Sequence, residues 1–501
     1  WLDSIVDHLI RRGLRPWICL CYGNGLYDER AAQTFGAVGW PPIYDEESRA
    51  AWGAYVRALV SRYKGRVSDY EVWNEPDGKW CWKAGPSGTE YGDLLAMTAR
   101  AVRSADPGAR VIGGSVCMRK LSFIDDALRA CGKDLPDAIT FHEYTADETQ
   151  VFERVRSLKA LLRRYDPKIT VIQGESGSQS RRDGEGALNG GAWTPRRQAR
   201  QLLRHTVADL LCGVEFTSYF SALDMLEGLN GKVGDKASYQ DYGYFGVLGA
   251  EFDENGVATG EYQPKSSYYA MQNLASVFEG EWELCDLPLM ARVEDSKLTF
   301  AQTLKGKELT GGGFLRENGA YLYAYWKPCD LMTTEYEGVV TLEVSGLPED
   351  FRLIDPMDGS VYAVPEKNIE RVGEQSFLLH ELPVRDYPLL LAAVCGPEKT
   401  RRWTALPAVM GILVVLHFYG AGHGWQLPLG IVDGLLLVGV IALPAAGVLT
   451  YGKPHALTLL DVCVTALAGL AIPASFSCLL LLRLLPYGGG LVLVPLVAAF
   501  C

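Results

Sequence analysis

The chain has 501 residues and a formal net charge of −12. An acidic balance of this size, with no long basic run, argues against a protein that binds nucleic acid. The 12 cysteines are scattered and form no paired framework, which argues against a disulfide-stabilised secreted domain. The length allows several domains, and the sequence pattern changes near residues 282 and 403.

The amino-terminal part alternates amphipathic segments with short apolar runs. Helical periodicity predicts helices at 2–12, 46–63, 91–105, 123–130, 151–165 and 195–211. The apolar runs predict strands at 15–21, 67–73, 110–113, 138–141, 169–173 and 214–220. Such repetition is typical of a parallel sheet with helical crossovers. Because a barrel of this kind closes with eight strands, we expect an α/β fold: a (β/α)8 TIM barrel over residues 1–281, N-terminally incomplete, with its first two β/α units missing.

Two of the predicted strands end in a glutamate. Strand 67–73 is followed by Glu75 and then by Pro76, which cannot continue a ladder. Strand 169–173 is followed by Glu175. The carboxyl ends of barrel strands form the rim on which catalytic residues gather. Two carboxylates on one rim are what glycoside hydrolysis requires, one as acid/base and one as nucleophile.

At these positions the chain resembles the clan A retaining glycoside hydrolases. The motif Asn74-Glu75-Pro76 follows what would be the fourth barrel strand, and Glu175 follows what would be the seventh. The segment Phe141-His142-Glu143-Tyr144 is similar to the clan's His-x-Tyr motif. Segments 244–248 and 264–270 resemble the close of β-xylosidase-like members. Over roughly residues 1 to 395, the chain is similar to the β-xylosidase/α-L-iduronidase family, glycoside hydrolase family 39.

The resemblance implies a role for each matching residue. Glu75 would be the acid/base, Glu175 the nucleophile, and Asn74 the residue that binds the sugar 2-hydroxyl. Tyr144 would steady the nucleophile. The other expected substrate-binding residues are His142, Trp80 and Tyr219. Tyr219 is a departure, because it stands after the last barrel strand where many members of the clan carry a tryptophan.

The chemistry also sets physical requirements. In a retaining mechanism one carboxyl is protonated while the other is ionised, so their surroundings must separate their pKa values. Closeness of two like charges raises one of the two pKa values, and hydrogen bonds from Tyr144 and Asn74 could hold the ionised partner. No cofactor is expected. No metal is expected either, because His142 has no second histidine at ligand spacing.

Several alternatives stay open at this point. His142 could be purely structural, and the rings of Trp80 and Trp82 could pack inside the protein instead of stacking on sugar. A rival class is a non-catalytic carbohydrate-binding or sugar-sensing membrane protein on a barrel scaffold. The presence of both Glu75 and Glu175 favours hydrolysis of O-glycosidic bonds. Xylosides, arabinosides, glucosides and uronides all remain candidate substrates, and the oligomeric state is open.

Strand patterns replace helical ones after residue 282. Short strands are expected at 298–303, 320–326, 339–344, 352–354, 377–379 and 388–394. They are separated by Gly, Pro and Asp turns, which predicts a β-sandwich domain over residues 282–396.

The last hundred residues are almost free of charge. Between 403 and 501 the charged side chains are Asp433, Lys453, Asp461 and Arg483. Apolar runs at about 403–422, 427–449, 456–482 and 484–501 have lengths near those that cross a bilayer. We therefore expect transmembrane helices over 403–501 and a membrane-anchored protein. The basic residues before and between the spans favour a cytoplasmic catalytic domain, and the side of the membrane stays open.

Overall fold

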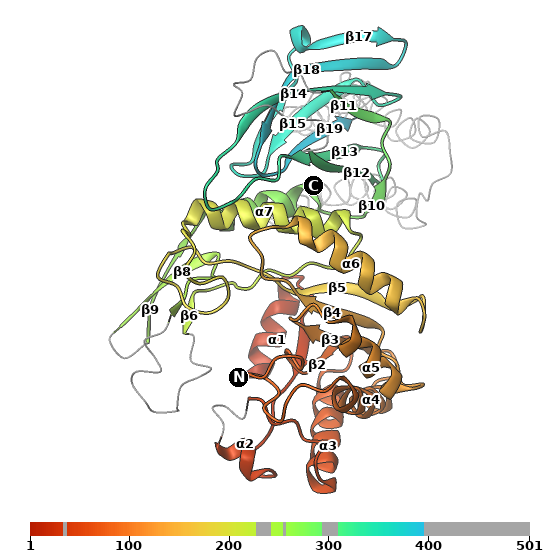
Figure 1. The fold of residues 1–501 in the computed structure, drawn as a ribbon, viewed down its shortest axis with the longest axis vertical. Helices are drawn as coiled ribbons and strands as arrows, with labels where there is room; N and C mark the ends of the chain where they lie inside the picture. Colours follow the sequence, from red (N-terminus) through yellow and green to blue (C-terminus); the bar gives the residue numbers. More distant parts are fainter. Residues whose placement is uncertain (34–37, 227–241, 254–256, 293–308, 395–501) are drawn as a thin grey trace, which may run out of the picture. The chain divides into compact units, whose positions relative to one another are not determined.

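The computed structural model describes residues 1–33, 38–226, 242–253, 257–292 and 309–394. A five-stranded parallel sheet organises the amino-terminal part (Figure 1). Its strands are β1 (Trp17–Leu20), β2 (Asp69–Val72), β3 (Arg110–Val116), β4 (Ala138–His142) and β5 (Thr170–Glu175). They lie side by side in chain order, which is the order that successive right-handed crossovers produce. The expected parallel α/β fold is confirmed.

The predicted sixth strand forms only part of a ladder. Gln173 makes an isolated parallel bridge with Thr217. The Gln173 amide donates to the Phe216 carbonyl at 3.0 Å, and the Ser218 amide donates to the Gln173 carbonyl at 3.0 Å. The chain therefore continues the sheet beyond β5 by a short run. The described residues form a five-stranded parallel sheet, and its closure into an eight-stranded barrel stays a prediction.

Helices follow the strands as the periodicity predicts. They are α1 (Leu2–Arg11), α2 (Glu29–Gln33), α3 (Glu46–Tyr63), α4 (Gly88–Ala105), α5 (Leu121–Cys131), α6 (Thr149–Leu162) and α7 (Pro195–Leu211). Side-chain caps mark three of the starts: Asp45, Ser87 and Thr194 each accept a hydrogen bond from the amide three residues on. The short helix α2 has no counterpart among the predicted helices, and neither does α8 (Ser266–Val277) further along the chain.

Charged side chains tie the amino ends of the strands together. Arg15 and Arg110 both contact the Asp69 carboxylate, at 2.6 and 3.3 Å. Arg110 also binds Glu215, at 2.6 Å, and so joins β3 to the segment beyond β5. These ion pairs all lie at the amino ends of the strands, at the edge of the sheet opposite the carboxyl ends.

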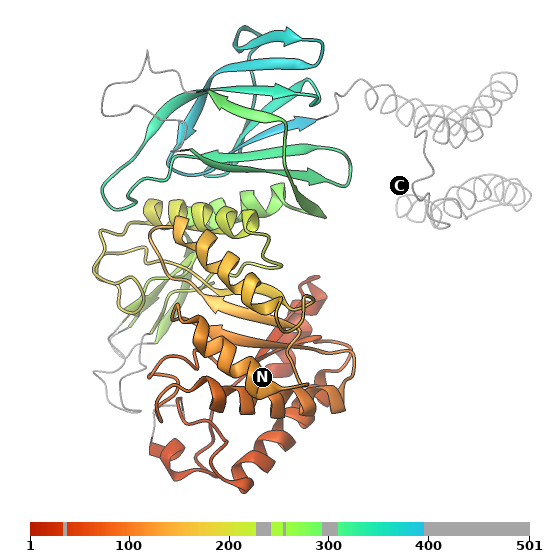
Figure 2. The ribbon, with the colours of Figure 1, turned by 45° about the vertical axis from the view of Figure 1, so that its right-hand side comes forward.

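The second part of the molecule is antiparallel (Figure 2). It begins with β6 (Met225–Leu226), β7 (Tyr242–Gly243), the hairpin β8 (Leu248–Phe252) and β9 (Ala258–Pro264), and α8 (Ser266–Val277). A six-stranded sheet comprises β10 (Trp282–Cys285), β12 (Thr310–Arg316), β13 (Tyr321–Trp326), β19 (Leu389–Val394), β15 (Asp350–Asp355) and β16 (Ser360–Ala363). A four-stranded sheet comprises β11 (Leu289–Arg292), β14 (Glu337–Ser345), β18 (Ser376–Arg385) and β17 (Ile369–Gly373), which follows η6 (Glu366–Asn368).

The two antiparallel sheets share one hydrophobic core, which is the packing that a β-sandwich requires. Five of the six predicted strands coincide with β13, β14, β15, β18 and β19. The sixth, 298–303, lies outside the described residues. Strand β12 escaped prediction because its first half is Gly311, Gly312 and Gly313, residues with no side chain to reveal a pattern.

Helix α7 connects the parallel sheet with the antiparallel sheets. Its apolar residues, among them Leu203 and Val207, belong to the same buried cluster as Phe314 of β12. The indole of Trp326 on β13 donates to Glu148, which precedes α6, at 2.7 Å. These contacts make residues 1–395 one compact unit.

The predicted membrane spans at 403–501 lie outside the described residues. Within the described ranges, none of the helices has the length and apolar character required to cross a bilayer. The membrane anchor and the side of the membrane on which the rest of the chain lies stay predictions.

Candidate active site

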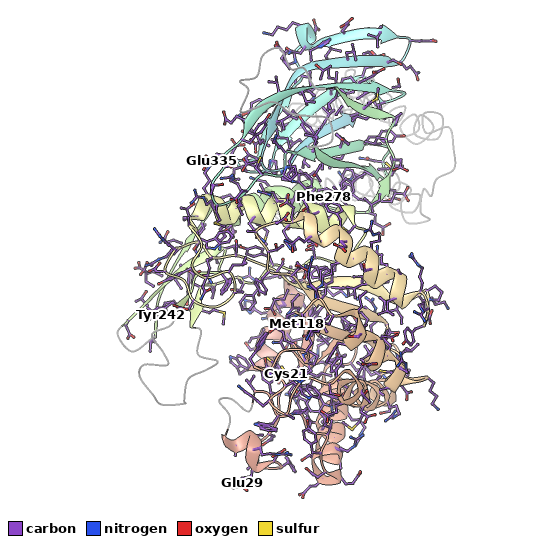
Figure 3. The ribbon with its side chains drawn as sticks, in the orientation of Figure 1. Cys21, Glu29, Met118, Tyr242, Phe278 and Glu335 are labelled. Atoms are coloured by element: carbon purple, nitrogen blue, oxygen red, sulfur yellow. The ribbon has the colours of Figure 1, made fainter. Side chains whose placement is uncertain are left out.

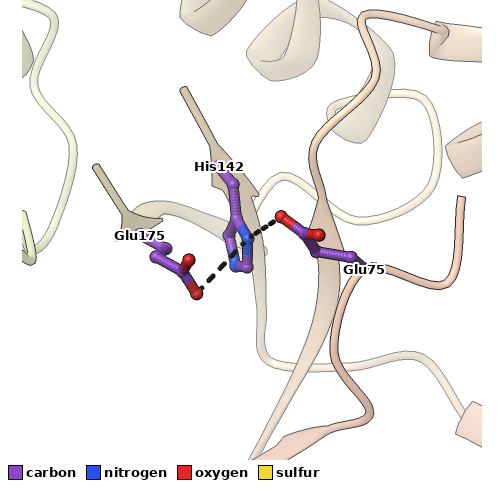
Figure 4. Close-up of side chains that lie close together, drawn as sticks. All are labelled: Glu75, His142 and Glu175. Carbon is purple, nitrogen blue, oxygen red and sulfur yellow. Dashed lines mark hydrogen bonds and ion pairs between the residues drawn. The ribbon is translucent and has the colours of Figure 1, made fainter. Parts of the chain in front are cut away.

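The two predicted glutamates and His142 meet at the carboxyl end of the parallel sheet (Figure 4). Glu75 follows β2, His142 is the last residue of β4, and Glu175 is the last residue of β5. His142 and Glu175 are paired across the neighbouring strands. Because these strands are parallel, their carboxyl ends open on the same edge, and side chains distant in sequence converge there.

The imidazole of His142 lies between the two carboxylates. Its Nδ1 atom is 3.0 Å from Oε1 of Glu75 and 3.6 Å from Oε2 of Glu175. One oxygen of each glutamate and a ring nitrogen of His142 all lie within 4.8 Å of one another. The two carboxylates are therefore close enough to act on the two atoms of a single bond.

A strained turn brings Glu75 onto this edge. Trp73 and Glu75 have φ angles of +65° and +43°, in the left-handed region that side chains other than glycine rarely adopt. Trp73 is fully buried, and its indole donates to the Cys81 carbonyl at 2.9 Å. Rings of Tyr22, Trp52 and Trp82 surround it at 5.5 to 6.1 Å. The packing around Trp73 stabilises the strained backbone at Trp73 and Glu75. Strained residues at functional sites persist only when their surroundings hold them in this way.

Glu175 is held by the tyrosine of the His-x-Tyr motif. The Tyr144 hydroxyl donates to Oε1 of Glu175 at 2.5 Å. Burial raises the pKa of Glu175 above its usual value, and the neighbouring charge of Glu75 adds to that effect. His142 and the hydrogen bond from Tyr144 act in the opposite direction but do not cancel it. The hydrogen bond expected of Tyr144 is confirmed, although burial dominates the pKa of the carboxyl that it contacts.

His142 carries a raised pKa. Burial is the largest influence and disfavours the imidazolium, but the hydrogen bond to Glu75 and the charges of the surrounding glutamates outweigh it. The backbone of His142 is held by Arg154, whose guanidinium donates to the His142 carbonyl at 2.7 Å. A cation at this position would lie against both carboxylates and screen their mutual repulsion.

A third glutamate, Glu71, lies beneath this group inside the sheet and was not predicted. Its carboxylate accepts hydrogen bonds from Ser115 at 2.8 Å and from Thr140 at 2.7 Å. Its charge raises the pKa values of His142 and Glu175. A charged residue inside an otherwise apolar strand, four positions before Glu75, is the signal that could have revealed it.

The two tryptophans of the loop after β2, Trp80 and Trp82, have different surroundings. The Trp80 indole nitrogen donates to Oε2 of Glu75, and the side chain is 39% exposed, so its ring borders the site. Trp82 is fully buried and packs against Trp73. Trp82 therefore packs inside the protein, which was one of the two alternatives for these rings. A contact between Trp80 and sugar stays a prediction.

Asn74 and Tyr219 make their contacts with groups other than the two carboxylates. The Asn74 amide nitrogen lies 3.7 Å from Sγ of Cys81, and within the described residues no hydrogen bond joins Asn74 to either glutamate. The expectation that Asn74 holds the ionised carboxylate is therefore wrong, because its amide turns toward the loop after β2. The Tyr219 hydroxyl is buried next to Ser178, and the ring packs on the core shared with the antiparallel sheets. Contacts of Asn74 and Tyr219 with sugar stay predictions.

The same three side chains could also offer one ligand atom each to a metal ion. Glu75, His142 and Glu175 form the one such group within the described ranges. Nδ1 of His142 lies 3.0 Å from Oε1 of Glu75 and 3.6 Å from Oε2 of Glu175, distances that suit both direct contact and shared coordination of an ion. A site without metal stays a prediction.

Fold and site together define a parallel α/β protein with a close carboxylate pair at the carboxyl end of its sheet. Residues 1–156 match the model of the family described as "Glycosyl hydrolases family 39". This range contains Asn74, Glu75, His142 and Tyr144, whereas Glu175 lies beyond it. The predicted resemblance to family 39 glycoside hydrolases is therefore confirmed for the amino-terminal part of the chain.

Individual relatives agree with the family match. A β-xylosidase from Geobacillus stearothermophilus is 31% identical over 160 residues, or 29% of this chain and 30% of the relative. A β-xylosidase from Caldicellulosiruptor saccharolyticus is 32% identical over 158 residues, or 29% of this chain and 31% of the relative. The match thus spans less than a third of these curated relatives. The crystal structure of a monomeric β-xylosidase from Caulobacter crescentus covers 79% of this chain and 84% of its own, with a TM-score of 0.50 and 15% identity, which shows a shared fold alone.

Proposed function

We propose that the protein is a retaining glycoside hydrolase that uses Glu175 as nucleophile and Glu75 as acid/base. The observation that carries the proposal is the separation of the two glutamates, whose facing oxygens lie within 4.8 Å of each other. Retaining enzymes hold their carboxyl groups about 5–5.5 Å apart, whereas inverting enzymes need about 6.5–9.5 Å to admit a water molecule. The short separation therefore supports double displacement.

In the first step, the Glu175 carboxylate attacks the anomeric carbon while Glu75 gives a proton to the leaving oxygen. The glycosidic bond breaks, and a glycosyl ester with Glu175 forms. In the second step Glu75, now ionised, takes a proton from water, which attacks the ester and releases the sugar. Tyr144 orients the attacking oxygen of Glu175, and His142 keeps the two carboxylates at their working distance.

We propose a β-xyloside as substrate and a complete (β/α)8 barrel as the scaffold. The names of the two matching relatives support the first part, and the parallel sheet with its consecutive strand order supports the second. Because the family match ends at residue 156, the segments that would line the rest of the sugar site contribute no support of their own. A panel of chromogenic glycosides tests the choice of sugar.

The mechanism is tested with two matched variants and one control. Glu75→Ala should lower turnover of a poorly activated β-xyloside by about 10²–10⁴-fold, the usual contribution of general acid–base catalysis. Glycosides with good leaving groups should restore glycosyl-enzyme formation by Glu75→Ala, and added azide should yield a β-glycosyl azide. Glu175→Ala should show neither effect, since nothing replaces the attacking carboxylate. Glu153→Ala, at an exposed position on α6, is the control.

Other outcomes would give the site a different role. Equal rescue of both glutamate variants by leaving group would contradict the assignment, and nuclear magnetic resonance showing an inverted anomer as first product would contradict retention. Binding of sugar without any turnover would favour the carbohydrate-binding alternative. Activity that is lost in a chelator and restored by a divalent ion would point to a metal held by Glu75, His142 and Glu175.

We also propose that the region from residue 403 onward anchors the protein in a membrane. The near absence of charge over 403–501 supports this proposal. Alkaline carbonate extraction of membranes that contain the full-length protein should leave it in the pellet. Release into the supernatant would contradict the anchor.

A further inference from the structure

Two free cysteines lie at the carboxyl end of β1. Cys19 is the third residue of the strand, and Cys21, which Figure 3 labels, directly follows its last residue. Because side chains alternate along a strand, residues two positions apart point to the same face. The Cys21 thiol donates to the Cys19 carbonyl, with Sγ 3.9 Å from the oxygen, and it also contacts the Cys19 thiol. The end of β1 therefore holds two neighbouring thiols.

This thiol pair lies beside the strained turn after β2. The Cys19 thiol donates to the Trp73 carbonyl, with Sγ 3.3 Å from the oxygen. Trp73 is one of the two residues whose positive φ angles shape that turn. The pKa of Cys19 is raised by its contact with Cys21, by burial, and by the charges of Glu71 and Glu175. Cys19 is therefore within electrostatic reach of the carboxylates of the candidate active site.

Cys21 differs from the other described cysteines in its pKa. Its contact with Cys19 lowers the pKa, and this effect outweighs both burial and the charge of Glu71. Eight cysteines are described, and the pKa values of all but Cys21 are raised. Because the thiolate is the reactive form of cysteine, Cys21 is the most nucleophilic of these eight thiols.

A pocket of about 360 Å³ gives small molecules access to Cys21, which is part of its lining. Tyr27 and Tyr55 of the same lining are 47% and 40% exposed, so the pocket is open to solvent. Cys81 and Cys131, in contrast, are buried, and burial raises the pKa of each to about 12. Thiolate character and accessibility, the two properties that decide which cysteines are oxidised, thus coincide at Cys21.

We propose that Cys21 is a modification site for peroxides, and that Cys19 converts the oxidised Cys21 into a disulfide. In the first step, the Cys21 thiolate attacks one oxygen of hydrogen peroxide. The O–O bond breaks, the departing hydroxide takes up a proton and becomes water, and Cys21 is oxidised to a sulfenic acid while the peroxide is reduced. In the second step, the Cys19 sulfur attacks the sulfur of Cys21. The S–S bond forms, the S–O bond breaks, and the departing hydroxide takes the proton of Cys19 to become water.

The spacing of the two cysteines permits this disulfide and makes it easy to reduce. Residues two positions apart in a strand have Cα atoms about 6.6 Å apart, at the upper end of the range of about 4.4–6.8 Å that is usual for disulfides. Strained disulfides react readily with thiols, so the modification should be reversible.

The disulfide should also slow the adjoining reaction. Its formation removes the S–H group of Cys19 that donates to the Trp73 carbonyl. Turnover should fall by about two- to tenfold, the range for the loss of one hydrogen bond. This effect on turnover rests on the proposed function, whereas the reaction of the two thiols does not.

The chemical test uses hydrogen peroxide and the full-length protein, and it requires no turnover. Trypsin releases the segment 13–30, which contains Cys19, Cys21 and no other cysteine. Mass spectrometry should show that this peptide loses two hydrogen atoms and regains them with dithiothreitol. The loss should be at least about tenfold faster than oxidation of Cys285, a half-buried cysteine of β10 whose pKa is raised by burial.

Two variants assign the roles of the cysteines. Cys19→Ser should accumulate a sulfenic acid at Cys21 that dimedone traps, because the second thiol is missing. Cys21→Ser should leave Cys19 reduced, because the raised pKa of Cys19 keeps it protonated. Circular dichroism confirms that each variant is folded. Oxidation of Cys285 ahead of segment 13–30 in the native protein, or a disulfide that joins Cys21 to Cys81, would overturn the proposal.

The kinetic test compares the rate of each protein before and after treatment with peroxide. The native protein and the matched control Cys285→Ser should lose turnover and recover it with dithiothreitol, whereas Cys21→Ser should keep its own initial rate. A disulfide without loss of turnover would uphold the modification site and contradict its effect on the reaction. If the untreated native protein hydrolyses no glycoside, the proposed function fails, and the peptide masses still decide whether the thiol pair reacts.

Discussion

Two buried groups of charged side chains in this protein differ in how their charges are balanced. At the carboxyl end of the parallel sheet, Glu71, Glu75 and Glu175 gather around one imidazole, that of His142. Acids outnumber bases, and the pKa values of His142 and Glu175 are both raised. Like charges this close cost folding free energy, which a protein retains where chemistry needs shifted pKa values.

Along α7 the buried arginines are paired with acids. Arg204 binds Glu148 at 2.6 Å, and both side chains are at most 3% exposed. Arg200 forms an equally buried pair with Asp386, next to the loop that precedes β19. The first pair joins α7 to the start of α6, and the second joins α7 to the antiparallel part of the molecule. The comparison indicates that an excess of buried acids accompanies the proposed active site, whereas paired buried charges accompany a structural interface.

The largest effect should come from removing the nucleophile. Glu175→Gln should lower turnover by about 10⁴-fold or more, since an essential member of a covalent mechanism is lost. It should not lower stability, because it removes one of several like charges from a buried group. Steady-state kinetics and urea unfolding, measured on the same preparation, check both parts. Clear destabilisation would show that Glu175 stabilises the fold, as the charges along α7 do, and would contradict the comparison.

The α7 pair should show the opposite behaviour. Arg204→Met leaves Glu148 buried without its partner and should cost about 3–5 kcal/mol of unfolding free energy. The double variant Arg204→Met with Glu148→Met should recover part of that loss, because no unpaired charge remains. Turnover per folded molecule should stay close to that of the native protein. Loss of activity in a folded double variant would show that the interface shapes the site.

A smaller effect should follow from loosening the nucleophile. Tyr144→Phe removes the hydrogen bond to Oε1 of Glu175, which is 2.5 Å long, and should lower kcat by about 10–100-fold, the range for a hydrogen bond to a charged group. That bond lowers the pKa of Glu175, so its loss raises the pKa further. Since the nucleophile acts when ionised, the acidic limb of the pH–rate profile should move to higher pH.

The smallest effect, of opposite sign, should come from Glu71→Gln. The variant keeps a hydrogen-bond acceptor for Ser115 and Thr140 but removes a charge that raises the pKa of Glu175. The pKa of Glu175 should fall, and the acidic limb should move to lower pH with little change in the maximal rate. Profiles of kcat/KM against pH for Glu71→Gln and Tyr144→Phe, recorded side by side, test the two directions. Displacement of both in the same direction would contradict the electrostatic account.

Local sequence pattern predicted the elements of this protein well where side chains carry a period. Helices α3 and α7 begin and end at the predicted residues, because their apolar positions recur with the helical repeat and Asp45 and Thr194 cap their first turns. Strand β12 was missed for the converse reason, since glycines contribute no pattern. The glutamates were found because Pro76 and the strand ends mark their positions along the chain.

The convergence of the site was decided by tertiary structure. The sequence by itself determined that Glu75 and Glu175 lie at the carboxyl ends of strands. Only the parallel sheet that contains β2 and β5 brings oxygens 100 positions apart in the chain within 4.8 Å. The direction of the Asn74 amide and the place of Glu71 beneath His142 depend on which neighbouring strand offers a partner. Hydrogen bonds and burial between segments distant in the chain determine these side-chain positions. The periodic pattern of a single segment contains no information about them.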